Sequence, residues 1–288
     1  MASEKKQRSP EELAEIVNFT PKSQEENEKS YAWFNWYFDP QFLGSENIPT
    51  DRGVLYVSNH SLYSIADMAV SIGIQRQTER PLRGLADRSH IDLPGWGKML
   101  KKMGAVLGDP QICSALMEAG QSILVFPGGG REVMKKRKEI YDLVWKERLG
   151  FVRLALQHNY DIVPVGVVGE GEMFHFIADS DDYMETRLGK AIHGAGLLDK
   201  YMRGKDELPP MVRGIGLTML PKPHRIYVAY GKPIRLSDLA NAKSDKETLL
   251  KAREVVSTAI RDLIDQGMEA RKNDPKPTPF LRRLLQNL

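Results

Sequence analysis

The sequence lacks several features that mark common classes of protein. It contains a single cysteine, Cys113, which excludes a disulfide framework and is typical of a reducing compartment. Its apolar runs fall short of the roughly 18 residues that a membrane-spanning helix needs, and no apolar stretch follows the charged N-terminus to form a secretory signal. We therefore expect a cytoplasmic protein that, if it meets lipid, does so peripherally.

Signatures of nucleic-acid binding, metal binding and serine hydrolysis are also missing. The net charge is only +3 over 288 residues, and basic residues are not interleaved with aromatic ones, so nucleic acid is not an expected partner. The histidines share no metal-ligand spacing and the chain has no cysteine pair, so we expect neither a metal site nor a resident cofactor. The absence of a Gly-x-Ser-x-Gly elbow argues against a serine hydrolase.

What the sequence does contain, from Gly53 onward, is an alternation of apolar runs of strand length with helix-like segments. The predicted strands are 53–58, 81–86, 104–107, 122–126, 161–168 and 225–230. The predicted helices are 64–74, 93–102, 111–119, 145–158 and 245–267. Strands separated by helices favour an α/β fold with a mostly parallel central sheet and helices on both faces.

The two ends of the chain differ from this central pattern. A helix is predicted from Ser9-Pro10, and a second one over 23–38, where the aromatic cluster between Tyr31 and Phe38 suits either a membrane interface or the core. Segment 170–222 is predicted to form long loops and short helices over the active face. The predicted organisation is an N-terminal helical element that faces the membrane (1–50), an α/β domain (51–270), and a Pro-rich linker with a short amphipathic tail (271–288).

The first candidate site segment follows the strand predicted at 53–58. Ligands bind at the carboxyl ends of strands in α/β sheets, and His60 follows this strand. An imidazole titrates near neutral pH and suits a general base, and Asp67 is a candidate to orient it. Asp67 has a second interpretation, because Ser64-x-x-Asp67 matches a capping box that opens the next helix. Asn59 is predicted to close the turn.

The second candidate segment follows the strand predicted at 122–126. Gly128, Gly129 and Gly130 offer backbone N–H donors, and Arg131 adds a guanidinium, which together suit an anionic or carbonyl oxygen. The other interpretation is a plain strand–helix turn in which the glycines serve a steric purpose. Glu132 is either a second carboxylate of the site or a favourable charge in the first turn of a helix.

Together these segments resemble the motifs of the glycerolipid acyltransferases, the PlsC-like lysophospholipid acyltransferases. The segment from His60 to Asp67 resembles the first block of that family, Phe126–Arg131 the third, and Ile162–Val165 the fourth. The run from Arg131 to Phe151 is most similar to the branch that contains diacylglycerol acyltransferases and transmembrane-protein-68-like enzymes. The resemblance extends from about Gly53 to Gly231.

The resemblance also shows where this chain departs from the family pattern. The family usually has four residues between the histidine and the aspartate, and this chain has six. Gly128 and Gly130 replace the usual Glu and Thr, which help to hold a glycerol phosphate, so the resemblance implies a more neutral acceptor. The second block, which contacts the acceptor through an arginine, matches poorly. Arg88 is our candidate there, and for Arg83 a solvated strand flank is the favoured interpretation.

A run of four basic residues, Lys135 to Lys138, follows the glycine turn. It is either a solvated face or an attractor for anionic lipid or the phosphates of coenzyme A. The function implied by the resemblance is transfer of a fatty acyl group from acyl-CoA, as co-substrate, or from acyl carrier protein to a lipid hydroxyl at a membrane surface. The alternatives are a lipid-binding protein on a degenerate acyltransferase scaffold, and a thioesterase with water as the acceptor.

Overall fold

A seven-stranded sheet forms the centre of the molecule. The structure, a computed structural model, describes residues 7–186, 208–236 and 245–288. The order of strands across the sheet is β1-β9-β6-β2-β5-β3-β4. The strands are β1 (Gln41–Leu43), β2 (Leu55–Ser58), β3 (Leu82–Ala86), β4 (Val106–Leu107), β5 (Ser122–Val125), β6 (Ile162–Val168) and β9 (Tyr227–Tyr230). Strands β6, β2, β5, β3 and β4 are parallel, whereas β9 runs antiparallel to β6 and pairs in parallel with β1. The predicted α/β fold with a mostly parallel sheet is confirmed.

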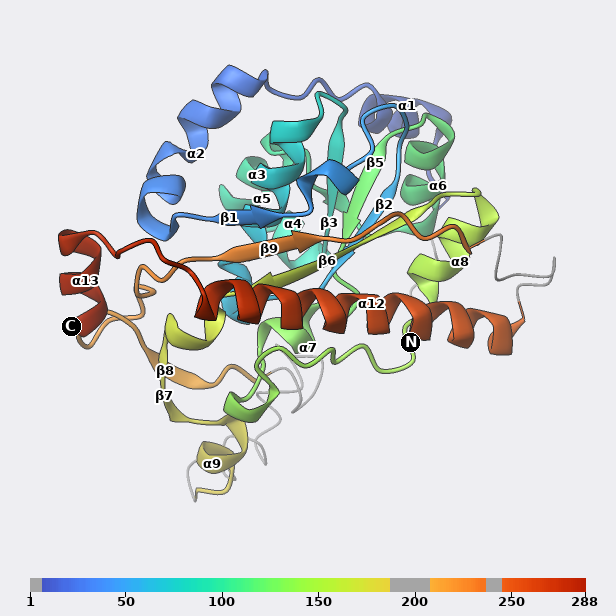
Figure 1. The fold of residues 1–288 in the computed structure, drawn as a ribbon. Coiled ribbons are helices and arrows are strands. Elements are labelled where there is room, and N and C mark those ends of the chain that lie inside the picture. Colours follow the sequence, from blue (N-terminus) through green and yellow to red (C-terminus); the bar gives the residue numbers. More distant parts are fainter. Residues whose placement is uncertain (1–6, 187–207, 237–244) are drawn as a thin grey trace.

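Helices cover both faces of this sheet (Figure 1). They are α1 (Pro10–Val17), α2 (Gln24–Phe38), α3 (Asp67–Gln77), α4 (Arg88–Ile91), α5 (Trp96–Lys102), α6 (Pro110–Glu118), α7 (Gly130–Val133), α8 (Gly150–Gln157), α9 (Ser180–Met184), α12 (Lys246–Lys272) and α13 (Phe280–Asn287). In the described parts of the chain, no helix combines the length and apolar character that crossing a bilayer requires.

The sheet separates two apolar cores, and β2 contributes to both. Side chains alternate between the faces of a strand, so Tyr56 packs with α2 and α3 on one face while Leu55 and Val57 pack with α6, α8 and α12 on the other. All four residues of β2 are buried. Burial on both faces explains why the strand reads as a continuous apolar run, as is usual for parallel sheets covered by helices.

Most elements begin and end where the sequence signals place them. Ser9 and Ser23 cap α1 and α2 through complete capping boxes with glutamates three residues later. The helix predicted over 145–158 begins only at Gly150, because Lys146 has a positive φ of 50° that a helix cannot include. The helix predicted over 93–102 begins at Trp96, after Gly95 with its φ of 77°.

Three short strands were not predicted. β1 holds only three partly exposed residues, too few to show an alternating pattern. β7 (His175–Ala178) and β8 (Met211–Arg213) pair with each other in a second, two-stranded sheet. These two strands lie within the segment predicted as loops and short helices. Residues 187–207 of that segment fall outside the part of the chain that the structure describes.

Candidate active site

Strands β2, β5 and β6 bring the candidate residues to one edge of the sheet. They are parallel neighbours, with Val57 opposite both Val125 and Pro164. His60 follows β2 and Phe126 follows β5, so both leave the sheet at its carboxyl edge, where α/β proteins bind ligands. Asn59 anchors this edge: its side-chain amide accepts from the N–H of Val167 at 2.8 Å and donates to the same residue's carbonyl at 3.0 Å. The predicted local turn at Asn59 is therefore replaced by a bond across to β6.

His60 and Asp67 form a direct pair despite the long spacing between them. The imidazole Nδ1 lies 2.5 Å from Oδ2 of Asp67, whose Oδ1 accepts from the N–H of Ser61 at 2.9 Å. A short 3-10 turn over Leu62–Ser64 takes up the extra residues. Within it Tyr63 and Ser64 have positive φ values of 54° and 58°, which turn the chain back towards His60.

The capping-box interpretation of Asp67 is wrong. Helix α3 begins at Asp67 itself, after Ala66, and no side chain caps its first turn. Ser64 lies in the preceding 3-10 turn, two residues before the N-cap position at Ala66, so the box is out of register with α3. The carboxylate of Asp67 is instead directed at His60 and at the backbone of Ser61.

The imidazole of His60 is also fixed on its flat face. Its ring stacks on Phe126, with 4.3 Å between the ring centroids and 19° between the planes. The His60 side chain remains 15% exposed, so the ring is accessible from solvent although two of its surfaces are occupied. The pair of contacts determines the orientation of the ring and leaves Nε2 as the nitrogen that a substrate can approach.

The glycine turn lies next to this histidine. Gly129 has φ 52° and ψ −149°, a conformation that suits glycine, and its N–H donates to the carbonyl of Phe126 at 3.1 Å. Within the described residues, the N–H groups of Gly128 and Gly130 donate to no protein acceptor. Arg148 donates to the carbonyl of Pro127 at 2.9 Å and thereby stabilises the turn. The turn therefore offers two backbone donors at the carboxyl end of β5.

Glu132 connects the glycine turn to the histidine loop. It is fully buried in helix α7, and its Oε2 accepts from the backbone N–H of His60 at 3.2 Å while Oε1 accepts from Val144 at 2.9 Å. Burial raises the pKa of the Glu132 carboxyl, and the cation of Lys135 acts in the opposite direction. The geometry matches the interpretation of Glu132 as a carboxylate of the site rather than a charge of the first helical turn. Both of its oxygens bind the backbone of neighbouring loops.

The arginines have more varied positions than the sequence indicates. Arg131 is buried and its Nη2 lies 2.5 Å from Glu139, while its Nη1 is buried without a hydrogen-bond partner. Arg88 is exposed at the start of α4, and none of the described contacts joins it to His60 or the glycine turn. Arg83 is buried, so a solvated flank is wrong. It donates to the carbonyls of Gly104 and Ile16 and packs under Phe19, and burial lowers its pKa to about 10.

The basic run from Lys135 to Lys138 is not an open cationic face. Lys135 is fully buried, and its ammonium lies 3.5 Å from Glu170 and donates to the carbonyl of His60 at 2.7 Å. Lys136 pairs with Asp181 at 2.6 Å. Arg137 donates to the carbonyl of Phe176 at 2.6 Å and lies over that residue's ring. Within this run only Lys138 retains the exposed, unpaired position that the sequence pattern suggests.

Two residues that sequence reasoning did not single out belong to this region. Glu170 follows the end of β6 after one residue, Gly169, and its carboxylate accepts from the backbone N–H of Leu62. Arg148 contacts the glycine turn from the loop before α8. A signal for Glu170 was present, because a carboxylate just beyond a buried strand lies at the ligand-binding edge of a parallel sheet.

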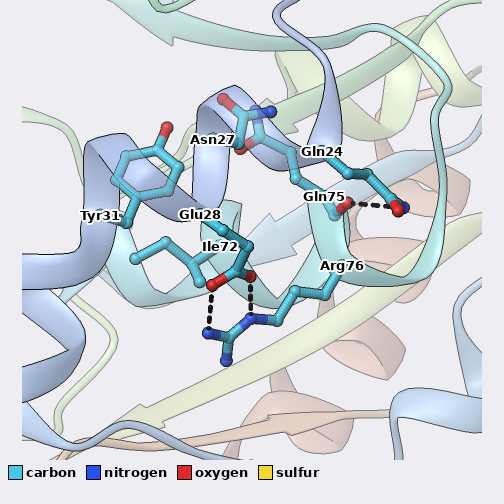
Figure 2. Close-up of a pocket in the computed structure, with 7 residues that line it drawn as sticks. All are labelled: Gln24, Asn27, Glu28, Tyr31, Ile72, Gln75 and Arg76. Carbon is cyan, nitrogen blue, oxygen red and sulfur yellow. Dashed lines mark hydrogen bonds and ion pairs between the residues drawn. The ribbon is translucent and has the colours of Figure 1, made fainter.

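A separate concavity of about 200 Å³ lies between α2 and α3. Figure 2 shows bonds within two pairs of its lining residues: Arg76 pairs with Glu28 at 2.6 Å, and Gln24 donates to the backbone carbonyl of Gln75 at 3.4 Å. None of the candidate site residues lines it. We therefore place the candidate active site at the edge formed by β2 and β5, around His60.

Comparisons with known proteins agree on one family. The model of the family described as Acyltransferase matches residues 39–168. The chain is 30% identical over 261 residues to phytyl ester synthase 2, chloroplastic, of Arabidopsis thaliana, covering 84% of this chain and 36% of that protein. It is 26% identical over 182 residues to diacylglycerol O-acyltransferase 2A of Umbelopsis ramanniana, covering 62% of this chain and 50% of that protein. The chain thus spans about a third of the first relative and half of the second.

Among solved structures, the chain is similar to the 1-acyl-sn-glycerophosphate acyltransferase PlsC of Thermotoga maritima. The TM-score is 0.48 at 16% sequence identity, and the match covers 89% of this chain and 83% of that one.

Proposed function

Because this chain belongs to the glycerolipid acyltransferase family, we propose that it transfers an acyl group from a thioester, acyl-CoA or acyl carrier protein, to the hydroxyl of a lipid. The observation that carries the proposal is the pairing of His60 with Asp67, 2.5 Å apart, beside a turn with free backbone N–H donors. These are the two requirements of direct acyl transfer: a general base and a site for the developing oxyanion.

The steps follow from the orientation of the imidazole. Asp67 holds a proton on Nδ1, so Nε2 accepts the proton of the acceptor hydroxyl as its oxygen attacks the thioester carbonyl. The N–H groups of Gly128 and Gly130 stabilise the negative oxygen of the tetrahedral intermediate. When this intermediate collapses, the carbon–sulfur bond breaks and the leaving thiolate takes the proton from the imidazolium. The acyl group passes directly from the thioester to the hydroxyl, without a covalent enzyme intermediate.

We further propose a neutral acceptor, such as a diacylglycerol or a long-chain alcohol. A phosphate-bearing acceptor needs cations that are free to bind it. Here two cations of the site are each paired with a carboxylate, Arg131 with Glu139 and Lys135 with Glu170. The relatives named as a phytyl ester synthase and a diacylglycerol acyltransferase support this choice, since both names denote esters of a neutral alcohol.

We propose that the chain receives this acceptor at a membrane surface. An exposed apolar surface is formed by the end of α2, the loop 215–221 and α13, which we call the α2–α13 surface. Its most exposed members are Trp33, Trp36, Leu217, Met219, Leu220, Phe280, Leu281 and Leu284. The end of α2 and α13 lie at the same end of the molecule (Figure 1).

Contacts join the three segments of the α2–α13 surface. Tyr37 on α2 donates to the carbonyl of Pro221 at 2.6 Å, and Arg282 on α13 pairs with Asp39 at 3.0 Å. The N–H of Gly216 donates to the carbonyl of Leu288 at 3.1 Å. The surface is therefore one fixed patch rather than three independent segments.

The charges beside the α2–α13 surface favour anionic lipid as its partner. The stretches 208–235 and 275–288 contain no aspartate or glutamate, whereas they contain Arg213, Lys222, Lys276 and Arg283 among other basic residues. Exposed tryptophans next to basic residues are typical of segments that lie in the bilayer interface. The segment that enters β8 contacts the turn after His60, since Tyr63 donates to the carbonyl of Pro210 at 2.7 Å.

The acceptor class is tested by product analysis. The full chain is incubated with palmitoyl-CoA or palmitoyl-acyl carrier protein and, in separate reactions, diacylglycerol, a long-chain alcohol or lysophosphatidic acid in vesicles. We expect esters of the neutral alcohols, detected by mass spectrometry, and little product from lysophosphatidic acid. A preference for lysophosphatidic acid would overturn the neutral-acceptor proposal and leave acyl transfer itself intact.

A further inference from the structure

A buried ion pair lies directly beneath the loop that carries His60. Lys135 and Glu170 have fully or almost fully buried side chains, with 0% and 2% exposure, and their charged groups lie 3.5 Å apart. Lys135 comes from the turn after α7, and Glu170 begins the short 3-10 turn that follows β6. The acyl-transfer steps described above use neither residue.

Each member of the pair also binds the backbone of the His60 loop. The ammonium of Lys135 donates to the carbonyl of His60 at 2.7 Å, and the carboxylate of Glu170 accepts from the N–H of Leu62. Glu132 binds the same loop from its other side, through the N–H of His60 at 3.2 Å. Three buried charged side chains thus bind three backbone groups within residues 60–62.

We propose that Lys135 and Glu170 are positioning residues, which hold the backbone of residues 60–62 so that the His60 ring meets Asp67 and the acceptor hydroxyl. The inference rests on the proposed function, and it assigns these two residues a purpose beyond stability. A buried ion pair is by itself weak evidence for stability, because apolar residues of similar volume often serve as well. Apolar residues could not make the hydrogen bonds that Lys135 and Glu170 make to the backbone of this loop.

The backbone conformation of the loop explains why such support is needed. Tyr63 and Ser64 both have positive φ values, which cost energy in residues other than glycine and are retained only when surrounding contacts determine them. The 3-10 turn they form is what returns Asp67 to His60 across the six intervening residues. Contacts to His60 and Leu62 therefore stabilise the part of the chain on which the catalytic pair depends.

The supporting charges depend on one another. Burial raises the pKa of Glu170 and of Glu132, and the cation of Lys135 opposes both shifts. Lys135 therefore favours the ionised form of both carboxylates, and Glu132 and Glu170 each accept two hydrogen bonds. Loss of Lys135 is expected to remove its own hydrogen bond to His60 and also to weaken the bond between Glu170 and Leu62.

Three variants separate positioning from stability. Lys135→Met/Glu170→Leu removes both charges at similar volume, Glu170→Gln retains an oxygen that accepts from Leu62, and Lys136→Met removes an exposed pair as the control. Melting temperature, amide hydrogen exchange at 60–64, the rate of His60 acylation by diethyl pyrocarbonate and the separate values of kcat and KM are measured for each. His60→Ala identifies the share of labelling that belongs to His60.

We expect the double variant to remain folded, to exchange the Leu62 amide at least about tenfold faster, and to lose kcat by about 10- to 100-fold with KM within about threefold. Glu170→Gln is expected to retain exchange protection and kcat to within about threefold, as Lys136→Met does. Wild-type exchange and kcat in the folded double variant would overturn the proposal. If the double variant fails to fold, equal losses in Glu170→Gln and a single Glu170→Leu variant would overturn it instead. Hydrogen exchange and labelling need no turnover, so they test the positioning even if the acyl-transfer function is wrong.

Discussion

The carboxylate of Glu132 occupies the space that a side chain at position 128 would need. A Cβ at Gly128 would lie 2.0 Å from Oε2 of Glu132, so the two positions cannot both carry a side chain in this arrangement. The family usually has a glutamate at the position of Gly128. In this chain a glutamate four residues later reaches the same space from helix α7 and binds the N–H of His60.

Gly128→Ala is therefore expected to displace Glu132 and to impair the site. The added methyl group overpacks a buried position, so we expect about 1–3 kcal/mol of lost stability and a lower kcat. Gly84→Ala is the matched control, because a Cβ at Gly84 meets no atom within 4 Å. Urea denaturation and steady-state kinetics of both variants test this. Equal behaviour of the two variants would show that the contact with Glu132 is unimportant.

Asp67→Asn tests the orientation of the imidazole. An amide nitrogen in place of Oδ2 would donate to Nδ1 and leave the ring proton on Nε2, where it blocks the base. We expect kcat to fall by roughly 100- to 10 000-fold with little change in the melting temperature. Asp262→Asn, on the exposed side of α12, is the control. Activity in Asp67→Asn close to that of wild type would mean that Asp67 has no part in the reaction.

The stability of Lys135→Met is expected to depend more steeply on pH than that of wild type. Burial raises the pKa of Glu132 and Glu170 above 4.5 in the folded state, and loss of Lys135 raises both further. A folded-state pKa above the unfolded one stabilises the protein at low pH, and this stability is lost as the pH rises through the folded-state value. Between about pH 5 and pH 8 the free energy of unfolding of Lys135→Met should fall progressively below that of wild type. A constant difference across this range would contradict the assigned environment of Lys135.

Membrane binding is expected to depend on the α2–α13 surface. Burial of a leucine side chain stabilises association by about 1.5–3 kcal/mol, so Leu281→Ser/Leu284→Ser should weaken binding to vesicles with anionic lipid at least about tenfold. Leu250→Ser, a partly exposed leucine on α12, should have no effect. Co-sedimentation with vesicles at two salt concentrations measures both variants. Unchanged binding by the double variant would place the lipid-binding surface elsewhere.

Much of the fold could be predicted because its strands are short apolar runs bounded by strong turn signals. Every residue of β2 and β6 is buried, so their sequences are continuous apolar runs without the alternation of a half-exposed strand. β1 could not be predicted, since three partly exposed residues after Pro40 gain their strand geometry from pairing with β9. Long-range pairing of this kind leaves no local signal in the sequence.

The candidate site was predictable in part. His60 and the glycines follow buried strands, which is a local signal, and the structure places them side by side. The pairing of Asp67 with His60 depends on the positive φ values of Tyr63 and Ser64, which the residue types do not predict. The roles of Lys135 and Glu170 depend on tertiary burial, so a lysine within a basic run gave no indication that it lies beneath the histidine.

We propose that His60 is the general base of an acyl transfer to lipid. The most direct measurement is the rate of thiol release from palmitoyl-CoA by wild type and His60→Ala, with and without vesicles that contain diacylglycerol. We predict that release by wild type requires the lipid and that His60→Ala lowers the rate by about 100- to 10 000-fold while the fold is retained. Lipid-dependent release at the wild-type rate by folded His60→Ala would contradict the claim.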